Sequence, residues 1–408
     1  MYQKNTFFND PIYGFITIES ELILKLINHP FFQRLRRISQ MGLSSFVYPG
    51  ANHTRFGHAL GSMHIMQRAI AVLVSKGIPV SFKESEAMQI AILLHDIGHG
   101  PFSHATEKAL FKGVHHETIS LRVFHLLNVS FNGKLDLAIQ IFTNNYSRKF
   151  MHQLISGQVD VDRLDYLKRD SFYTGVTEGN INTDRILAMM NVEGEQLVFE
   201  YKGVHSLEKF LLARRLMYWQ VYLHKTSLVA ELLLVKTLQR FRYLVEMDKE
   251  KLSEAHILKP LLNQNENEPI SEAILAHYLL LDDSDILSLL KQWCSHTDPI
   301  LKQLSQQLIN RNLPKIKIQE EPFTANEIIS KKKRLKGLEM QEEEEIDFFV
   351  FHGSISNQTY FTDQVQILIK EKSGKVEPMA KYVSYLDSNA FSSPNVKHYL
   401  CYPKQNNS

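Results

Sequence analysis

Apolar residues recur at steps of three and four through most of this chain, and this period constrains the fold more than any other feature of the sequence. The pattern extends from about Glu21 to Leu313 and is typical of amphipathic α-helices. After Leu313, short segments with strand-like alternation follow, namely KIKI, DFFVFHG, VQILIKEKSGKV and KHYLCYP. The sequence therefore predicts a mainly α-helical protein, with a helical domain over residues 1–310 and a smaller α+β region over residues 311–408.

Local signals predict where individual elements begin and end. Residues 1–20 predict a short strand pair around a turn at Asn9-Asp10-Pro11. A buried helix is predicted over Ser85–His95, with Ser85 as its N-cap. A long amphipathic helix, or two helices with a kink, is predicted over Ser206–Met247, and Asn263–Pro269 predict a surface loop.

The α+β region carries its own local signals. Ser373-Gly374 predicts a hairpin turn between two strands. Thr324 and Glu327 have the spacing of a capping box that opens a helix. The basic run Lys331–Arg334 and the acidic run after it predict a solvated face.

Composition excludes several classes of protein. With 44% hydrophobic and 22% charged residues, the chain predicts a packed core and not a disordered segment. Lys plus Arg is 46 and Asp plus Glu is 44, a balance that does not favour nucleic acid as a partner. Two cysteines exclude a disulfide scaffold and a thiolate zinc cluster. We find no leader pattern and no apolar stretch that spans a bilayer, so we expect a cytoplasmic protein without a membrane partner.

Histidines concentrate in one part of the chain, which points to a chemical site. Eight of the 18 histidines lie between His53 and His116, and histidine is a common metal ligand and proton shuttle. His95 and Asp96 are adjacent at the end of an apolar helix, where unpaired polar groups are costly. Together with His58 before them and Asp162 after them, they have the composition of a divalent-metal site, for Mn, Fe, Mg or Zn. Taken alone, the His-Asp pair also fits a capping aspartate beside a core histidine.

Two further helix faces carry polar and aromatic candidates. Asp162, Tyr166 and Asp170 recur at four-residue steps, so they share a face. Tyr166 could stack on a sugar, and Asp170 could accept from a sugar hydroxyl. A second face combines cations with tyrosines, namely Arg214, Tyr218, Tyr222 and Lys225. The same patterns occur in solvated helices and in ordinary packing stripes.

An ordered set of motifs resembles a known family. RFGHALG, LLHDIGHGPFSH, HHE, DVDRLDYLKRD and YLHK resemble the HD-domain metal phosphohydrolases. The similarity is greatest to their deoxynucleoside-triphosphate triphosphohydrolase branch, which includes the sterile-alpha-motif-and-HD-domain enzyme of animals. It covers most of residues 5–235, with the core motifs in 40–235. The resemblance implies an HD-domain helical core that binds a divalent metal ion through His58, His95, Asp96 and Asp162.

The same resemblance implies roles for further residues. His116 would protonate the leaving oxygen, Glu107 would replace an aspartate that orients this histidine, and His104 would line the site. Judged by spacing alone, His115 is an alternative to His116 as the active histidine. By the same criterion, His104 could equally be a residue that packs in a loop. Tyr218 stands where relatives often have histidine, and Tyr222 beneath a deoxyribose would exclude a 2′-hydroxyl. The implied substrate contacts are Gln40, Arg55, His99, Arg163, Tyr166, Asp170, Arg214, Tyr218 and Tyr222.

Regulation and assembly are also implied by the resemblance. Some relatives form tetramers through nucleotides at a second site, so we expect a homo-oligomer, a dimer or a tetramer, and an allosteric nucleotide. Asn9, Gln33 and Arg36 match part of that site. Asn28 replaces an acidic residue that reads guanine, and an amide lacks the two acceptors that guanine needs. We therefore expect no activation by guanine nucleotides through that position.

The sequence as a whole predicts a metal-dependent dNTP triphosphohydrolase. Water would attack the α-phosphorus, and the products would be a deoxynucleoside and tripolyphosphate. Three arginines, Arg55, Arg163 and Arg214, would hold the phosphates. The alternatives are another HD phosphohydrolase reaction, by a nucleotidase or phosphodiesterase, and a non-catalytic nucleotide sensor or single-stranded nucleic-acid binder.

Overall fold

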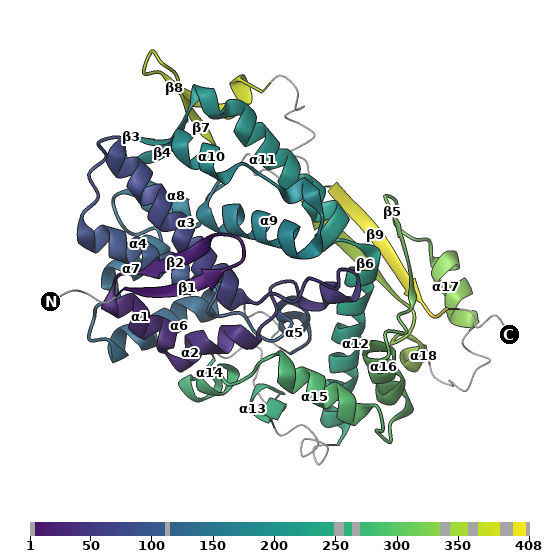
Figure 1. Ribbon diagram of the computed structural model, residues 1–408. Helices are drawn as coiled ribbons and strands as arrows, with labels where there is room; N and C mark the ends of the chain where they lie inside the picture. Colours follow the sequence, from purple (N-terminus) through teal and green to yellow (C-terminus); the bar gives the residue numbers. More distant parts are fainter. Residues whose placement is uncertain are drawn as a thin grey trace.

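The structure is a computed structural model, and it shows a mainly helical body with small sheets at its edges (Figure 1). It describes residues 5–110, 115–248, 257–262, 270–334, 343–357, 366–383 and 395–404. The predicted mainly α fold class is confirmed. The predicted loop Asn263–Pro269 lies outside the described residues. Among the described helices, none has the length and hydrophobicity needed to cross a membrane.

The helices follow one another through most of the chain. Their bounds are α1 (Glu21–Asn28), α2 (Pro30–Gln33), α3 (Arg55–Ser75), α4 (Phe82–Leu94), α5 (Ser103–Leu110), α6 (His116–Ser130), α7 (Asp136–Phe142), α8 (Lys149–Ile155), α9 (Val161–Thr174), α10 (Thr183–Met189), α11 (Val204–Met217), α12 (Lys225–Met247), α13 (Lys259–Leu262), α14 (Glu272–Tyr278), α15 (Asp283–Trp293), α16 (Pro299–Ile309), α17 (Ala325–Lys333) and α18 (Glu343–Ile346). A π-helical turn, Tyr218–Tyr222, separates α11 from α12. Of the two predicted alternatives, the structure therefore shows two helices, and the kink between them is this π-helical turn.

The strands form three small sheets. Their bounds are β1 (Thr6–Asp10), β2 (Gly14–Ile18), β3 (Met190–Glu193), β4 (Gln196–Glu200), β5 (Lys315–Gln319), β6 (Phe351–Asn357), β7 (Leu368–Lys370), β8 (Val376–Pro378) and β9 (Asn395–Tyr402). The predicted N-terminal strand pair is the antiparallel hairpin β1–β2. The other sheets have the orders β3-β4-β7-β8 and β5-β9-β6.

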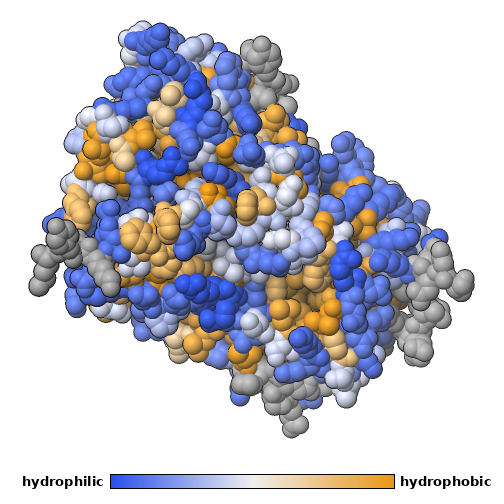
Figure 2. Space-filling view, viewed as in Figure 1, coloured by the Kyte–Doolittle hydropathy of each residue, from blue (hydrophilic) through white to orange (hydrophobic). Residues whose placement is uncertain are grey.

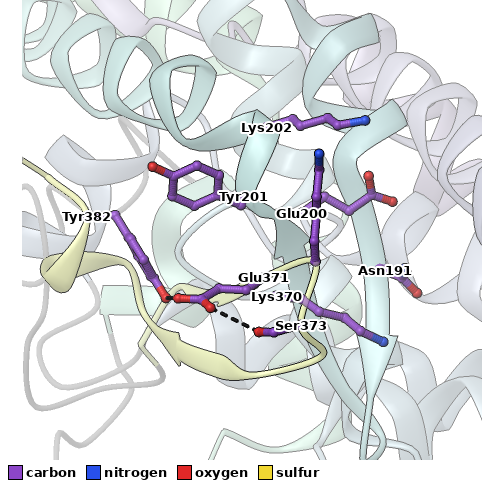
Figure 3. A pocket seen from close by; sticks show the side chains of 9 residues that line it. Asn191, Glu200, Tyr201, Lys202, Lys370, Glu371, Ser373 and Tyr382 are labelled. Atoms are coloured by element: carbon purple, nitrogen blue, oxygen red, sulfur yellow. Dashed lines mark hydrogen bonds between the residues drawn. The ribbon is translucent and has the colours of Figure 1, made fainter.

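Two strands from the C-terminal region, β7 and β8, pair with strands of the helical domain, whereas β5, β6 and β9 form a sheet of their own. The predicted turn Ser373-Gly374 lies between β7 and β8, and Gly374 has a positive φ of 88°, which favours glycine. β7 pairs in parallel with β4, so this hairpin completes a sheet that begins with β3 and β4. Figure 3 shows the hairpin from close by, where Glu371 accepts hydrogen bonds from Ser373 and Tyr382. The domain boundary at residue 311 stays a prediction.

The core of the body is the set of helices that carries the histidine motifs. α3 is buried on most of its faces, from Phe56 to Leu73, and it packs against α4 and α9. α4 begins at Phe82, three residues before the predicted start. The prediction of Ser85 as N-cap is wrong, because Ser81 caps the helix. The Oγ of Ser81 accepts from the Glu84 N–H at 3.2 Å, and the Glu84 carboxylate accepts from the Ser81 N–H at 2.8 Å. This reciprocal pair satisfies two free amides of the first turn.

The outer surface mixes polar and apolar residues. The face in Figure 2 is largely hydrophilic, with apolar residues in separate patches. Phe7 and Phe15 of the β1–β2 hairpin are 56% and 67% exposed, and their rings meet edge to face at 6.1 Å. The predicted capping box at Thr324 is confirmed, because Thr324 and Glu327 bond reciprocally at the start of α17.

The crossing of α3 and α9 depends on a glycine. A Cβ placed on Gly61 would lie 2.1 Å from Asp165 Oδ1 and 2.2 Å from Arg169 Nη2. A side chain at this position would therefore push apart two helices that carry predicted metal ligands. Gly57 lies one turn earlier on α3. A Cβ there would lie 3.5 Å from Arg169 Nη1, which is an ordinary van der Waals distance.

We expect Gly61→Ala to lower the free energy of unfolding by about 2–3 kcal/mol, because the added methyl overpacks a buried crossing. The matched control is Gly57→Ala on the same helix, which should be neutral or stabilising by up to about 1 kcal/mol through helix propensity. Urea denaturation of both variants measures the difference. Equal stability of the two variants would contradict the close crossing.

Candidate metal and substrate site

Three helical segments bring the four predicted metal ligands together. His58 comes from α3, His95 and Asp96 follow α4, and Asp162 lies in the first turn of α9. Asp162 Oδ1 lies 3.0 Å from His58 Nε2 and 3.4 Å from His95 Nε2. Asp96 lies 3.7 Å from His58 Nε2 through Oδ2 and 3.4 Å from His95 Nε2 through Oδ1. Residues up to 104 positions apart in sequence thus form one cluster, in which His58 is buried and His95 and Asp162 are partly buried.

The nitrogens of this cluster are arranged as metal ligands require. His58 Nε2 and His95 Nε2 are both buried and face Asp162 Oδ1, and among the described residues no group outside the cluster bonds to either atom. Their other ring nitrogens are occupied, since His58 Nδ1 bonds to Asp165 Oδ2 at 2.8 Å and His95 Nδ1 bonds to the Ile92 carbonyl at 2.6 Å. Partners of this kind fix the orientation of metal-binding histidines. The residues therefore fit a divalent ion with nitrogen and oxygen ligands.

Charges in the cluster favour a bound cation. Burial opposes the ionisation of Asp162, but His58 and His95 hold the pKa of its carboxyl well below the usual range. Burial likewise opposes the ionisation of Asp96, but His95 and Arg55 hold its pKa well below the usual range. Burial lowers the pKa of His58, yet hydrogen bonds to Asp162 and Asp165 raise it to about 10. A metal ion that binds His58 must displace that proton, so its affinity depends on pH.

A second group, which contains the predicted general acid, adjoins the cluster. His116 Nδ1, at the start of α6, lies 3.1 Å from Glu107 Oε1 on α5. The ring of His116 stacks on His99 with centroids 3.8 Å apart, and His99 Nε2 lies 3.2 Å from Asp96 Oδ1. Glu107 therefore reaches the histidine that it was predicted to orient. The side chain of His104 lies outside the described residues.

Residues that the sequence analysis missed hold the loop between α4 and α5. Buried Arg34 donates to the His99 carbonyl at 2.8 Å and to the Leu281 carbonyl at 2.6 Å. The Tyr278 hydroxyl donates to the Gly98 carbonyl at 2.9 Å. A Cβ on Gly98 would lie 2.3 Å from the His116 carbonyl, so the loop and α6 approach as only glycine allows. No periodic pattern marks Arg34 or Tyr278, because their partners are far away in sequence.

The three predicted phosphate-binding arginines differ in their pairing. Arg55 Nη1 donates to Asp96. Arg163 Nε donates to the Gly157 carbonyl at 3.0 Å and lies 3.1 Å from Asp160. Arg214 Nη1 is buried and has no hydrogen-bond partner among the described residues. Burial lowers the pKa of the Arg214 guanidinium. Arg55 Nε is likewise buried without a hydrogen-bond partner among the described residues, so both arginines have a nitrogen that could donate to an anionic ligand.

The predicted sugar-binding residues also converge. The rings of Tyr166 and Tyr222 meet edge to face at 6.2 Å, and Tyr218 meets Tyr222 at 6.0 Å. The Tyr222 hydroxyl donates to Asp170 Oδ2 at 2.7 Å. Tyr218 and Tyr222 begin and end the π-helical turn, and such turns are frequent at functional sites. Gln40 Oε1 is buried without a hydrogen-bond partner among the described residues.

The residues predicted for a regulatory site lie near the N-terminus. Asn9 is in β1, and Asn28 ends α1. Gln33 Oε1 accepts from Arg36 Nε at 2.8 Å, and the Arg36 guanidinium lies 3.6 Å from the centroid of the Phe56 ring. A regulatory role for these residues stays a prediction.

A surface hollow lies between β4 and the β7–β8 turn (Figure 3). Its described lining includes none of the predicted site residues. The lining carries charges of both signs, such as Lys202, Lys370 and Glu200.

Comparison with known proteins agrees with this geometry. The family profile of the HD domain matches residues 55–170, and that of the HD associated region matches residues 181–274. The crystal structure of a phosphohydrolase from Bacteroides thetaiotaomicron superposes with a TM-score of 0.91 and 44% identity. It covers 98% of this chain and 100% of that one. The protein YwfO of Bacillus subtilis is 32% identical over 97% of this chain and 92% of its own length.

The chain belongs to the HD-domain phosphohydrolase family.

A relative whose name states a specific activity is more distant. The deoxynucleoside triphosphate triphosphohydrolase SAMHD1 homolog of Dictyostelium discoideum is 30% identical over 54% of this chain and 46% of its own length. The chain thus spans about half of that relative. The HD domain match contains all four predicted metal ligands, and the match to the HD associated region contains Arg214, Tyr218 and Tyr222.

We expect Asp165→Asn to weaken binding of a divalent ion by about 10- to 100-fold, because the amide no longer fixes the charge and orientation of His58. Competition with a chelator measures the affinity, using Mn²⁺ as the probe. The matched control is Asp184→Asn, which removes an exposed partner of Arg68 and should leave the affinity unchanged. Unchanged Mn²⁺ affinity in Asp165→Asn would contradict the assignment of His58 as a ligand.

Proposed function

We propose that this HD phosphohydrolase is a metal-dependent dNTP triphosphohydrolase that releases a deoxynucleoside and tripolyphosphate. The observation that carries the proposal is the junction at Asp96. There the cluster of His58, His95 and Asp162 adjoins the pair of His116 and Glu107 through His99. The predicted metal ligands and the predicted general acid thus lie beside each other, an arrangement that suits phosphoester hydrolysis. The activity for which the Dictyostelium relative is named supports the same substrate class.

The residues of this chain divide the reaction between them. A divalent ion at the four ligands would polarise a phosphoryl oxygen and lower the pKa of water. Arg214 would hold phosphate oxygens, since its Nη1 is buried without a partner among the described residues. As water attacks the α-phosphorus, the bond to the 5′-oxygen breaks. His116 would protonate that oxygen, and Glu107 would hold the opposite ring nitrogen.

A second candidate is hydrolysis of a nucleoside monophosphate or a phosphodiester. The pairing of Arg55 with Asp96 and of Arg163 with Asp160 favours it, because these cations are already balanced by carboxylates. A triphosphate carries more negative charge than Arg214 alone would neutralise. For a triphosphate, the remaining charge would fall to the divalent ion and to Arg55 or Arg163, if these exchanged partners.

The products of hydrolysis distinguish the two candidates. Purified protein with Mn²⁺, Mg²⁺ or Fe²⁺ is given each dNTP and NTP, and the products are separated by chromatography and identified by phosphorus NMR. We expect tripolyphosphate and a deoxynucleoside from dNTPs, and no hydrolysis by Asp162→Ala. Orthophosphate or pyrophosphate would contradict attack at the α-phosphorus. Tight dNTP binding with no turnover, alone or in mixtures, would indicate a nucleotide sensor.

We expect His116→Gln to lower kcat by about 10²- to 10⁴-fold, because the leaving 5′-oxygen loses its proton donor. A p-nitrophenyl phosphodiester serves as the matched substrate, since its leaving group needs no proton. Its hydrolysis should fall much less in the same variant. His115→Gln is the control variant, because the exposed His115 precedes α6 and forms no side-chain cap. An equal loss with both substrates would rule out His116 as the general acid.

A further inference from the structure

His53 is a buried histidine that the proposed mechanism does not use. It lies in the segment before α3, and its side chain is 2% exposed. Its Nε2 lies 2.7 Å from Asp170 Oδ1, while the other oxygen of Asp170 accepts from the Tyr222 hydroxyl at 2.7 Å. Because an ionised carboxylate can only accept, the contact places the histidine proton on Nε2. His53 and Tyr222 thus bind one carboxylate from two sides.

The position of His53 is determined by packing as well as by this bond. Its ring stacks on Tyr173 with centroids 4.4 Å apart and planes 12° apart. A Cβ on Gly50 would lie 2.4 Å from the Tyr173 carbonyl, so the segment is pressed against the end of α9. His53 Nδ1 is buried without a hydrogen-bond partner among the described residues. An apolar ring would fill the space without that cost, so packing alone does not explain the histidine.

His53 also connects to a second predicted sugar contact. The Gln40 N–H donates to the His53 carbonyl at 3.0 Å. The Gln40 side-chain oxygen is buried without a hydrogen-bond partner among the described residues. Gln40 through its backbone, and Asp170 through its side chain, are therefore both held by His53. A ligand group that donates to the Gln40 side-chain oxygen would give that buried atom a partner.

We propose that His53 is a positioning residue that fixes Asp170 to accept a hydrogen bond from the 3′-hydroxyl of the nucleotide sugar. The inference rests on the proposed function. Asp162 and Asp170 are eight residues apart on α9, about 12 Å along the helix axis. A nucleotide with its phosphates at Asp162 would direct its sugar toward Asp170 and Tyr222. His53 holds the carboxylate by Oδ1, so its direction does not depend on Tyr222 alone.

The test compares a dNTP with its 2′,3′-dideoxy counterpart, which lacks the 3′-hydroxyl. His53→Phe keeps a ring over Tyr173 but removes the donor to Asp170. We expect the ratio of kcat/KM values, dNTP over dideoxy, to fall about tenfold in this variant. The value for the dideoxy substrate should change less than threefold. His53→Gln places an amide N–H near Nε2 and should restore most of the ratio.

A second variant keeps the test decisive if His53→Phe folds poorly. Asp170→Asn should lower the same ratio, and adding His53→Phe to it should lower the ratio no further. Equal losses for both substrates in His53→Phe would reduce His53 to a packing residue and overturn the inference. If the wild-type protein hydrolyses neither substrate, the proposed function fails and the inference fails with it. Turnover by the wild type with an unchanged ratio in the variants overturns the inference alone.

Discussion

The carboxylate of Asp165 lies fully buried between α3 and α9, and the site depends on what it binds. It accepts from His58 Nδ1 at 2.8 Å and from two nitrogens of Arg169 at 2.8 and 3.0 Å. Arg169 in turn donates to Asp10 of the N-terminal hairpin at 2.9 Å. Charges this deep are stable only when each one is paired, and removal of one partner leaves the others exposed to a large desolvation cost. The network thus sets the helix spacing, the direction of His58 and the docking of the hairpin together.

Asp96 is a second carboxylate that contacts several residues of the site. Its carboxylate lies between His95 and His99, and it also accepts a hydrogen bond from Arg55. Burial and the charge of Arg55 lower the pKa of His99, which stacks on His116, well below its usual value. A single carboxylate therefore lies between the predicted metal ligands and the pair of His99 and His116.

The sequence predicted the helical class, the N-terminal hairpin and the residues of the cluster, because these depend on periodicity and on an ordered motif. It misplaced the start of α4, since both Ser81 and Ser85 have the chemistry of a cap and only the carboxylate of Glu84 decides between them. It did not predict Asp165 as the partner of His58, or Arg34 as the support of the loop. These contacts join residues 107 and 65 positions apart, and no local pattern encodes such pairings. The assignment of His58, His95, Asp96 and Asp162 as metal ligands stays a prediction.

The parallel pairing of β4 with β7 has a consequence for how the chain is made. Val198 pairs with Leu368, 170 residues later. During synthesis the helices of the HD body can pack as soon as they emerge, because domains fold from the N-terminus onward. β4 meanwhile presents an unpaired edge, with Val198 and Phe199 among its apolar residues, until the β7–β8 hairpin has been translated. Between the translation of β4 and that of the β7–β8 hairpin, the nascent chain can form wrong strand pairs. During the same time, chaperones can bind the exposed edge of β4.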